Sequence, residues 1–390
     1  MAASIMKKPG GVSRWWILAI VHLSTLAFAM TLQLIPPLLP AFVAQFGMTR
    51  GQAGLLMAFF TLPGIFLSLP GGYLADHLGP RKVGLVSLSL LAAGTLVMVI
   101  GGLPFLFLGR LLSGVGAGSL MVVVPQVISQ RFVGREIGLA MGLFNTAVPL
   151  GTIMAFNLMV PITQSFGVLA AITWTAVFDL LALAGFFLIF TDQPLDPNAG
   201  PAPTVRGGLK NLGRGIWITA AVWALFNMAL MSFFTYGIDF FTLSGFGPNY
   251  SAFLASIPMM LSIPLAPVAG MALDRYGWRT GPIILGGVAC AIAVFCIAYY
   301  PHLALLETIA LGVGVAFIPP SIFTIAGEVL PKEKMGVGFG LLSTIFNIGL
   351  FTAIPVLGAM KDSFGTYGPS FTVMAVLLLV SSRLSFLLRK

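Results

Sequence analysis

Residues 71–84 read GGYLADHLGPRKVG, a short polar stretch between two long apolar segments. A related stretch, GMALDRYGWRTG, occupies residues 270–281, and a shift of 198 residues brings the two into register. The shift aligns Gly72, Asp76, Gly79, Arg81, Gly114, Gly116, Gly138 and Gly142 with Gly270, Asp274, Gly277, Arg279, Gly312, Gly314, Gly336 and Gly340. Because charged residues and glycines coincide in one frame without a gap, the pattern indicates an internal duplication.

The composition places most of the chain in lipid. Of the 390 residues, 58% are hydrophobic and 8% are charged, and the mean hydropathy is +1.02. A soluble protein of this length could not cover its surface with so few charges. A bilayer core about 30 Å thick needs about 20 apolar residues per helix. The apolar runs therefore predict an all-α integral membrane protein with twelve spans, near 15–37, 51–74, 83–101, 104–128, 138–160, 168–190, 215–239, 251–273, 281–300, 303–326, 337–359 and 369–388.

The basic residues predict the orientation of these spans. If the N-terminus is cytoplasmic, seventeen of the twenty Lys and Arg residues fall on that side, Arg50 and Lys361 fall on the other, and Arg110 lies inside a span. Cytoplasmic loops carry an excess of Lys and Arg. We therefore expect a multi-pass protein of the cytoplasmic (inner) membrane with both termini in the cytoplasm. The net charge of +9 is a topology signal and gives no support to nucleic-acid binding.

The longest polar interruption lies halfway along the chain. Residues 191–214 are rich in Pro and Gly and predict a cytoplasmic linker between a six-helix bundle in residues 1–190 and another in residues 215–390. Six helices repeated in one orientation imply two pseudo-symmetric bundles related by an axis along the membrane normal. The pathway for a solute would lie between them.

The two polar stretches resemble the cytoplasmic signature of the major facilitator superfamily, G-x-x-x-D-x-x-G-x-[RK]-[RK], which that family repeats in its second half. The number of spans, the central linker and the duplication extend the resemblance over the whole chain. It implies a secondary transporter whose halves rock about a central site that opens to one side at a time. It implies no particular substrate.

The resemblance also implies gate residues at the cytoplasmic ends of the spans. Asp76 and Arg81, with Asp274 and Arg279 in the second half, would favour the state closed to the cytoplasm. A carboxylate there can meet the positive end of a neighbouring helix, and an arginine can pair with an acid such as Glu328 or with carbonyls. The alternative is that these residues only cap helices and set the topology.

Arg110 is the most informative single residue of the sequence. It lies about five residues inside the fourth span, where a guanidinium is costly and cannot lose its charge, so it must face a cavity or a partner. In the family that the chain resembles, an arginine of this span lines the central cavity. Arg110 would then bind an anionic group of the substrate or tune a nearby acid. The alternative is an interfacial arginine that reaches outward to water.

Three acids inside spans are candidates for proton coupling. Asp179 lies near the middle of span six, where a carboxyl group would carry a proton or form a buried structural pair. Asp239 and Glu307 lie near the outer ends of spans seven and ten, helices that line the cavity in the resembling family. An acid in one half and a base in the other could close an outer gate. The alternative for both is an interfacial acid exposed to water.

Uncharged polar residues complete the predicted substrate site, because each would be costly if it faced lipid. The candidates are His22, Gln33, Gln126, Asn145, Asn227, Tyr236 and Asn347. Pro36, Pro37 and Pro40, at the end of span one, predict a bend in a gating helix.

The sequence offers no phosphate-binding loop, paired metal ligands or nucleophile motif, so we expect no enzyme, cofactor or metal. We expect a monomeric transporter of a small molecule, energised by the solute's own gradient or by a coupled proton. Arg110 favours a small organic or inorganic anion. The alternatives are a proton-antiport efflux pump for lipophilic compounds, which the many Phe and Met residues suggest, and a sensor of the same fold that transports nothing.

Overall fold

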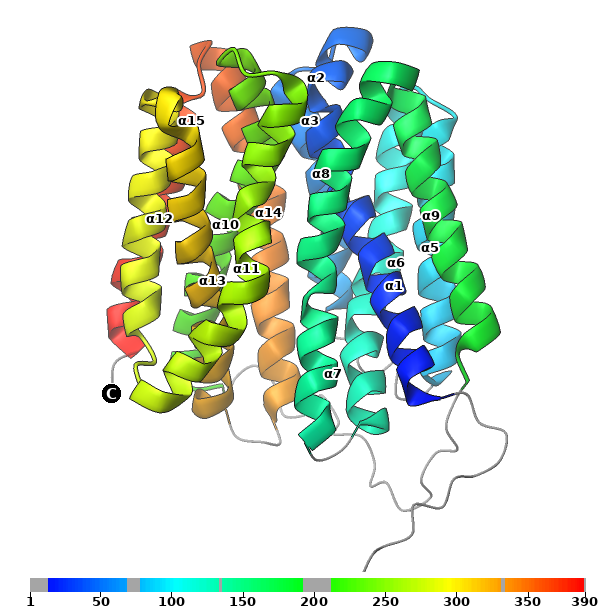
Figure 1. Ribbon diagram of the computed structural model, residues 1–390, viewed down its shortest axis with the longest axis vertical. Helices are drawn as coiled ribbons and strands as arrows, with labels where there is room; N and C mark the ends of the chain where they lie inside the picture. The colour runs from blue at the N-terminus through cyan, green and yellow to red at the C-terminus, as the bar shows by residue number, and fades with distance from the viewer. Residues whose placement is uncertain (1–12, 69–77, 133–134, 192–211, 331–333, 389–390) are drawn as a thin grey trace, which may run out of the picture.

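The computed structural model describes residues 13–68, 78–132, 135–191, 212–330 and 334–388. These residues form twelve helical spans that are long and apolar enough to cross a membrane. The all-α, twelve-span prediction is confirmed (Figure 1).

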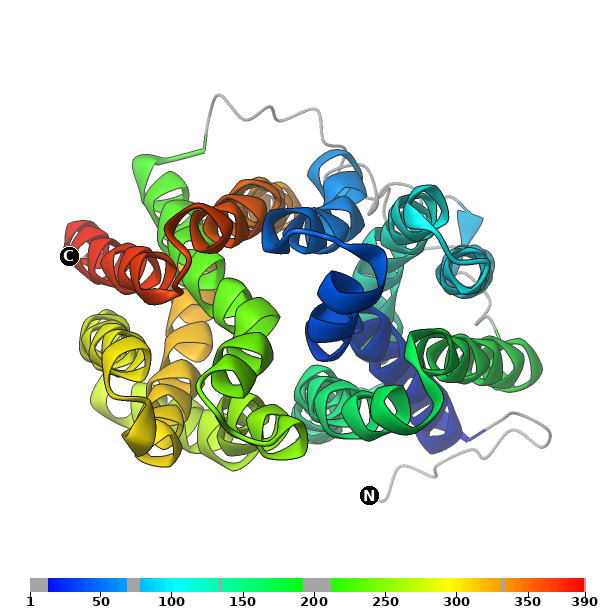
Figure 2. The same cartoon turned by 90° about the horizontal axis from the view of Figure 1, so that it is seen from above.

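The helices fall into two groups that lie side by side when the molecule is seen from above (Figure 2). The first group, the N half, contains α1 (Arg14–Leu32), α2 (Ile35–Phe46), α3 (Arg50–Leu67), α5 (Pro80–Val99), α6 (Leu103–Arg131), α7 (Arg135–Asn145), α8 (Ala147–Phe166) and α9 (Val168–Ile189). The second group, the C half, contains α10 (Arg214–Leu243), α11 (Pro248–Tyr276), α12 (Gly281–Tyr299), η3 (Pro301–Leu303), α13 (Ala304–Val329), α14 (Met335–Phe364), α15 (Gly368–Ser385) and η5 (Phe386–Leu388).

The predicted linker, residues 191–214, lies almost entirely outside the described residues.

The first span differs from the prediction because it does not end at its prolines. It runs from Arg14 to Phe46, 33 residues, with a short interruption at Gln33 and Leu34 between α1 and α2. Pro36 and Pro37 lie in the first turn of α2. Amide hydrogens in the first turn have no acceptor within the helix, so proline, which lacks this hydrogen, is tolerated there. The prolines therefore begin a second helical segment instead of ending the span.

The duplication is visible in helix packing. A Cβ added to Gly114 of α6 would collide with the backbone of Phe60 on α3. A Cβ added to Gly312 of α13 would meet the backbone of Pro258 on α11, and both residues of this second contact lie 198 positions after those of the first. Small residues at such positions let membrane helices approach closely. The two halves thus repeat the same helix contact, in agreement with the expected pseudo-symmetry.

Each of the two polar stretches places a glycine with a positive φ at the matched position. Gly79 precedes α5 with φ of 82°, and Gly277, which lies 198 residues later, ends α11 with φ of 65°. A positive φ is costly for residues with a side chain but not for glycine. Both copies therefore need glycine at this point to reverse the chain between spans.

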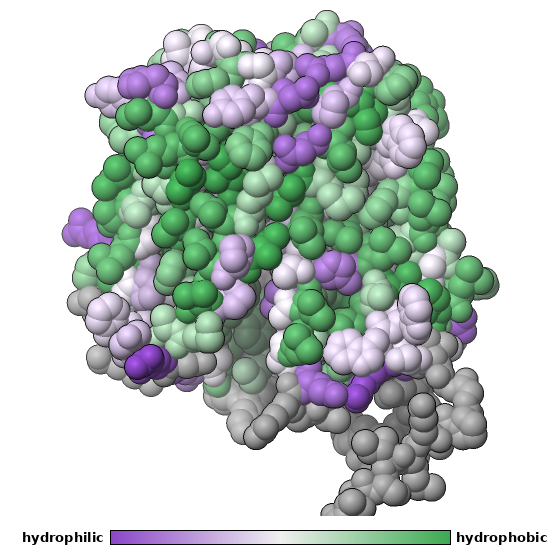
Figure 3. Space-filling view, viewed as in Figure 1, coloured by the Kyte–Doolittle hydropathy of each residue, from purple (hydrophilic) through white to green (hydrophobic). Residues whose placement is uncertain are grey.

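The described chain begins and ends on the same side of the molecule (Figure 1), which we call the terminal side, and the opposite face is the far side. Between them an apolar belt covers the surface in Figure 3, with polar residues above and below. Large side chains such as Phe166 and Leu188 are 76% and 77% exposed in the isolated chain. Such a belt is the surface that a bilayer covers.

A matched pair of glycines on α6 tests this packing. In Gly116→Ala the new methyl group would collide with the carbonyl of Ser87 and the amide of Leu91 on α5, whereas in Gly118→Ala it would meet atoms no closer than 3.8 Å. Overpacking of this kind costs about 1–3 kcal/mol. We expect Gly116→Ala to lower the thermal unfolding temperature of the purified protein and Gly118→Ala to leave it nearly unchanged. Equal effects would contradict the close α5–α6 contact.

Candidate functional site: a far-side gate above a central cavity

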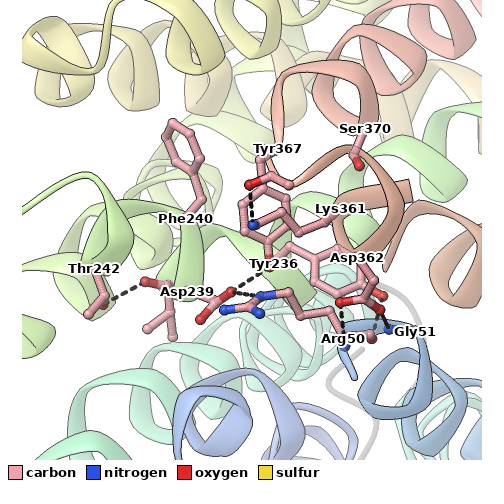
Figure 4. A network of polar contacts seen from close by, with 12 residues as sticks. Arg50, Gly51, Tyr236, Asp239, Phe240, Thr242, Lys361, Asp362, Tyr367 and Ser370 are labelled. Atoms are coloured by element: carbon pink, nitrogen blue, oxygen red, sulfur yellow. Dashed lines mark hydrogen bonds and ion pairs between the residues drawn. The ribbon is translucent and has the colours of Figure 1, made fainter. Parts of the chain in front are cut away.

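A buried ion pair joins the two halves on the far side. Arg50, the first residue of α3, donates from Nε to Oδ2 of Asp239 on α10 at 2.7 Å (Figure 4). Tyr367, between α14 and α15, donates to the same oxygen at 2.6 Å. Burial, and then the neighbouring Asp239 carboxylate, raise the pKa of Tyr367 well above its usual value, so its hydroxyl remains a donor. The Asp239 side chain is 3% exposed, and its charge is held by these two donors.

A second acid of the C half binds the start of α3. The two carboxylate oxygens of Asp362, near the end of α14, accept from the backbone amides of Arg50 and Gly51 at 3.0 and 2.8 Å. The first amides of a helix have no partner within the helix and form its positive end. Asp362 therefore caps a helix of the opposite half, and α3 is held to the C half by its side chain and its backbone.

Glycines bring α3 and α14 into direct contact beneath this ion pair. A Cβ at Gly54 of α3 would clash with the Tyr236 hydroxyl and would press on the backbone of Ile354 and Pro355. The Tyr236 hydroxyl donates to the Ile354 carbonyl at 2.6 Å. We call these contacts, together with the residues that bind Arg50, the far-side gate.

A cavity of about 310 Å³ lies between the halves, on the terminal side of this gate. Along α3, Phe60 of its wall is ten residues from Arg50, or about 15 Å at the rise of a helix. The N half contributes Phe28, Leu32, Phe60, Thr61, Gly64, Ser68, Gly114, Ala117, Gly118 and Met121. The C half contributes Trp223, Met231, Phe323, Phe339, Leu342, Ser343, Phe346, Asn347 and Leu350. Among the described residues that line the cavity, none is charged and six are aromatic.

Asn347 is the predicted substrate-binding residue that lines the cavity. Its amide nitrogen lies 2.8 Å from the Ser343 carbonyl and 3.4 Å from the Ser68 hydroxyl across the interface of the halves. Gly64 makes room for it, because a Cβ at Gly64 would overlap the Asn347 amide. An amide in an otherwise apolar wall can orient a bound solute.

Arg110 lies inside the N half and not in the cavity wall. Its side chain is fully buried, and it donates to the carbonyls of Leu56, Thr31 and Leu32 at 2.9, 2.6 and 3.2 Å. The guanidinium also stacks on the ring of Phe60, 4.4 Å from its centre. The expectation that Arg110 needs a partner inside the protein agrees with this geometry, and its role in binding substrate stays a prediction.

The three acids have different surroundings. Asp179 of α9 is fully buried and accepts hydrogen bonds from Thr31 and Thr95. Asp239 belongs to the far-side gate, as described above. Glu307 of α13 is 6% exposed, and its carboxylate oxygens have no hydrogen-bond partner among the described residues. The proton-coupling role of all three stays a prediction.

The other predicted substrate-binding residues whose side chains the structure describes lie outside the cavity wall. His22 is half-buried on α1, and Asn145 is exposed at the end of α7. Gln33 is buried at the interruption between α1 and α2, and Asn227 is buried and bonds the carbonyl of Trp223. Tyr236 lies in the far-side gate. The side chain of Gln126 lies outside the described residues.

On the terminal side, two of the predicted gate residues meet. Arg279 and Glu328 of the C half form an ion pair of 2.8 Å, and both side chains are partly exposed. Arg81 donates to the Phe187 carbonyl of its own half at 3.2 Å. Asp76 and the side chain of Asp274 lie outside the described residues. The gate function of all five stays a prediction.

The sequence analysis assigned no gate role to three residues of the far-side gate, Arg50, Asp362 and Tyr367. Arg50 served only to set the orientation, and Asp362 and Tyr367 fall between the predicted spans 337–359 and 369–388. One signal was available, since Arg50 and Lys361 are the two basic residues assigned to the far side. A basic residue on a side that carries few others is a candidate for an ion pair with an acid.

The two halves, the cavity between them and the gate across one end define a membrane transporter. The chain matches the family model described as Major Facilitator Superfamily over residues 21–350 and 242–390. The protein therefore belongs to the major facilitator superfamily, a family of secondary transporters.

The individual relatives share low sequence identity with this chain. The chain is 22% identical to the lysosomal dipeptide transporter MFSD1 of Homo sapiens over 334 residues, which cover 80% of this chain and 72% of that protein. It is 27% identical over 301 residues to an uncharacterized MFS-type transporter of Mycobacterium tuberculosis, covering 75% and 66% of the two chains. The crystal structure of a D-xylose-proton symporter superposes with a TM-score of 0.78 over 96% of this chain and 97% of the other, at 14% identity. That likeness establishes the fold.

The gate can be tested by opening it. Arg50→Gln leaves the buried Asp239 charge without its cation, so the closed far side should lose stability. The reporter is Ser343→Cys in a background whose Cys290 and Cys296 are replaced, labelled by a membrane-impermeant thiol reagent added on the far side. We expect this cysteine to react about tenfold faster when Arg50→Gln is present. A tenfold change corresponds to a loss of about 1.4 kcal/mol in the free energy that favours the closed far side.

The matched control is Arg14→Gln, which breaks the exposed Arg14–Glu136 pair inside the N half. It should leave the labelling rate unchanged. An Arg50→Gln rate equal to that of the control would show that the ion pair does not hold the far side closed.

Proposed function

We propose that the protein carries a small solute across the cytoplasmic membrane by alternating access, with the central cavity as its binding site and the far-side gate as one of its two barriers. The observation that supports this most directly is the Arg50–Asp239 pair. It joins opposite halves on the far side of a cavity that both halves line. A contact of this kind can exist in only one of two arrangements of the halves, which is what alternating access requires.

The charges at the helix ends support an orientation. Among the described residues, Arg50 and Lys361 lie near the far-side ends of α3 and α14, whereas Arg14, Arg81, Arg214 and Arg279 lie near helix ends on the terminal side. We propose that the terminal side is cytoplasmic, that residues 191–214 link the N half (1–190) to the C half (215–390), and that the protein works as a monomer.

For the substrate, the cavity favours a small organic solute with an apolar face. Trp223 stacks with Phe346, with ring centres 6.1 Å apart, and lies 5.1 Å from Phe323, so one wall is aromatic. Pockets of about 300 Å³ hold molecules of modest size. Asn347 supplies a hydrogen-bonding group to orient the solute. The lipophilic substrates of an efflux pump would fit the same wall.

An anion remains the second candidate because of one contact. Phe60 lies in the cavity wall, and the guanidinium of Arg110 stacks on its ring. An anion could bind Arg110 only if that ring moved aside. The geometry of this state gives the apolar solute more support, and the anion needs a further rearrangement.

A panel of solutes decides between the candidates. Purified protein is heated with dipeptides, a pentose, small monocarboxylates or flat aromatic compounds, and a solute that binds the folded state raises the unfolding temperature. Solutes that bind are then tested for counterflow in liposomes. Stabilisation by a compact monocarboxylate alone would overturn the apolar proposal, and counterflow of no solute would argue against transport.

A pair of substitutions on α14 localises the site. Asn347→Leu removes the amide from the cavity wall, so we expect counterflow of any solute found above to fall about tenfold, the loss of one or two hydrogen bonds. Thr352→Val is the control, because the Thr352 hydroxyl bonds only carbonyls of its own helix. Equal transport by the two variants would place the binding site elsewhere.

A third substitution separates the two roles of Arg110. Arg110→Lys keeps the positive charge but cannot bond three carbonyls at once. If the main role is to hold the α1–α2 interruption, the variant should unfold at a lower temperature, and a saturating anion should not restore it. Full stability with weakened binding of an anion would instead assign Arg110 to the substrate.

A further inference from the structure

Asp179 differs from the other acids within the spans in the kind of group that binds it. Asp239 contacts a cation, and Glu307 has no hydrogen-bond partner among the described residues. Asp179 is fully buried, takes part in no ion pair within the described chain, and is bonded by two hydroxyl groups. Hydroxyls both donate and accept hydrogen bonds, so such a site does not demand a charged carboxylate.

The two hydroxyls are not equivalent. The hydroxyl of Thr31 on α1 lies 3.0 and 2.9 Å from Oδ1 and Oδ2 of Asp179, and both of these acceptors belong to the same carboxyl group. The hydroxyl of Thr95 on α5 lies 2.8 Å from Asp179 Oδ2 and 3.0 Å from the carbonyl of Leu91, one turn back on its own helix. A hydroxyl has a single hydrogen. Thr95 can therefore satisfy only one of its two acceptors at a time.

This arrangement serves both protonation states of the carboxyl group. When Asp179 is ionised, Thr95 donates to Oδ2. When Oδ2 binds a proton, the new O–H donates to the Thr95 oxygen, and the Thr95 hydrogen turns to the Leu91 carbonyl. Thr31 continues to donate to Oδ1 in both states. Neither state leaves a buried polar group without a partner, so proton binding at Asp179 does not add the cost of an unsatisfied hydrogen-bond donor or acceptor.

The helices packed against α9 carry few other charges. They are α1, α2, α5 and α8. Their titratable groups are Arg14 and His22 on α1 and Arg81 and Lys82 on α5, and all except His22 lie in the first turn at the terminal side. Within the described residues, the buried charge linked to Asp179 is that of Arg110, whose Nη1 bonds the carbonyl of Thr31 while the Thr31 hydroxyl bonds Asp179. Arg110 and Asp179 thus both bond Thr31 and do not contact each other.

We propose that Asp179 is the binding site of a coupled proton, with Thr95 as the hydroxyl that changes its acceptor when the proton binds. The inference rests on the proposed transport function and names the ion that would be coupled to it. Proton binding at Asp179 would act on the cavity through Thr31. The next residue, Leu32, lines the cavity, and its carbonyl accepts a hydrogen bond from Arg110. Loading of Asp179 thus changes the charge balance at the turn where α1 meets the solute.

The proton itself is the probe in the first test. Infrared spectra of the protein in liposomes are recorded at a series of pH values from about 5 to about 9. We expect a carbonyl stretching band of a protonated carboxyl group in an apolar environment that is lost as the pH rises and is missing from Asp179→Asn. A spectrum with no titrating band that depends on Asp179 would overturn the proposal.

The second test addresses Thr95 and remains informative if Asp179→Asn folds poorly. Thr95→Val removes the hydroxyl that changes acceptor, so we expect the midpoint of the band to move by about one pH unit or more, a tenfold change in proton affinity. Thr152→Val is the matched control, because Thr152 is a buried threonine that bonds only the Val148 carbonyl of its own helix. Equal midpoints in the two variants would overturn the role of Thr95.

Transport then separates this inference from the proposed function. For a solute that the wild-type protein moves, two quantities are measured: accumulation driven by an imposed pH gradient, and counterflow. We expect Asp179→Asn to lower the ratio of the first to the second by about tenfold. An unchanged ratio would overturn proton coupling at Asp179 while transport stands. If the wild-type protein moves no solute, the transport proposal fails, and the infrared titration alone decides whether Asp179 binds a proton.

Discussion

A polar group inside a bilayer must find its partner within the protein, because lipid offers none. The first span shows what this constraint demands. Pro36 has no amide hydrogen for the carbonyl of Leu32, four residues before it, and Arg110 of α6 donates to that carbonyl at 3.2 Å and to the carbonyl of Thr31 at 2.6 Å. A positive charge also suits the end of a helix, where carbonyls accumulate. The interruption of α1 and the burial of Arg110 therefore stabilise each other, and the N half is built around this contact.

The same constraint bears on the switch that we propose at the far-side gate. Asp239 is almost fully buried while Arg50 holds it, and separation of the halves must return both groups to water or to new partners. The Coulomb attraction within such a pair is largely offset by the cost of removing the two charges from water. The closed arrangement is thus specific without being overwhelmingly stable. A transporter needs this balance, because a gate that was too strong would hold it in one state.

The sequence predicted the spans well and the contacts poorly, for a physical reason. Span positions follow from long apolar runs, and the largest departures are the first span, which continues to Phe46 beyond its prolines, and the fifth, which is divided into α7 and α8 and continues to Phe166. Arg110 could be singled out because a buried guanidinium is costly, but its partners are backbone carbonyls of α1 and α3, which every residue possesses and no sequence pattern marks. Arg50 and Asp239 are 189 residues apart, and their pairing depends on how the halves meet. Asn347 lies in the cavity wall and not toward lipid, as its polar side chain within an apolar span predicted, and its role in binding substrate stays a prediction.

The first span connects the two polar centres of the molecule. Phe28 and Leu32 of α1 lie in the cavity wall, and Thr31 between them contacts Asp179 and Arg110. Beyond the interruption, α2 packs against α10, the helix that carries Asp239. A change in the bend between α1 and α2 would therefore act on the cavity at one end and on the far-side gate at the other. Because Arg110 holds the bend through the carbonyls of Thr31 and Leu32, any second geometry of the bend has to provide new partners for the guanidinium and for these carbonyls within the protein.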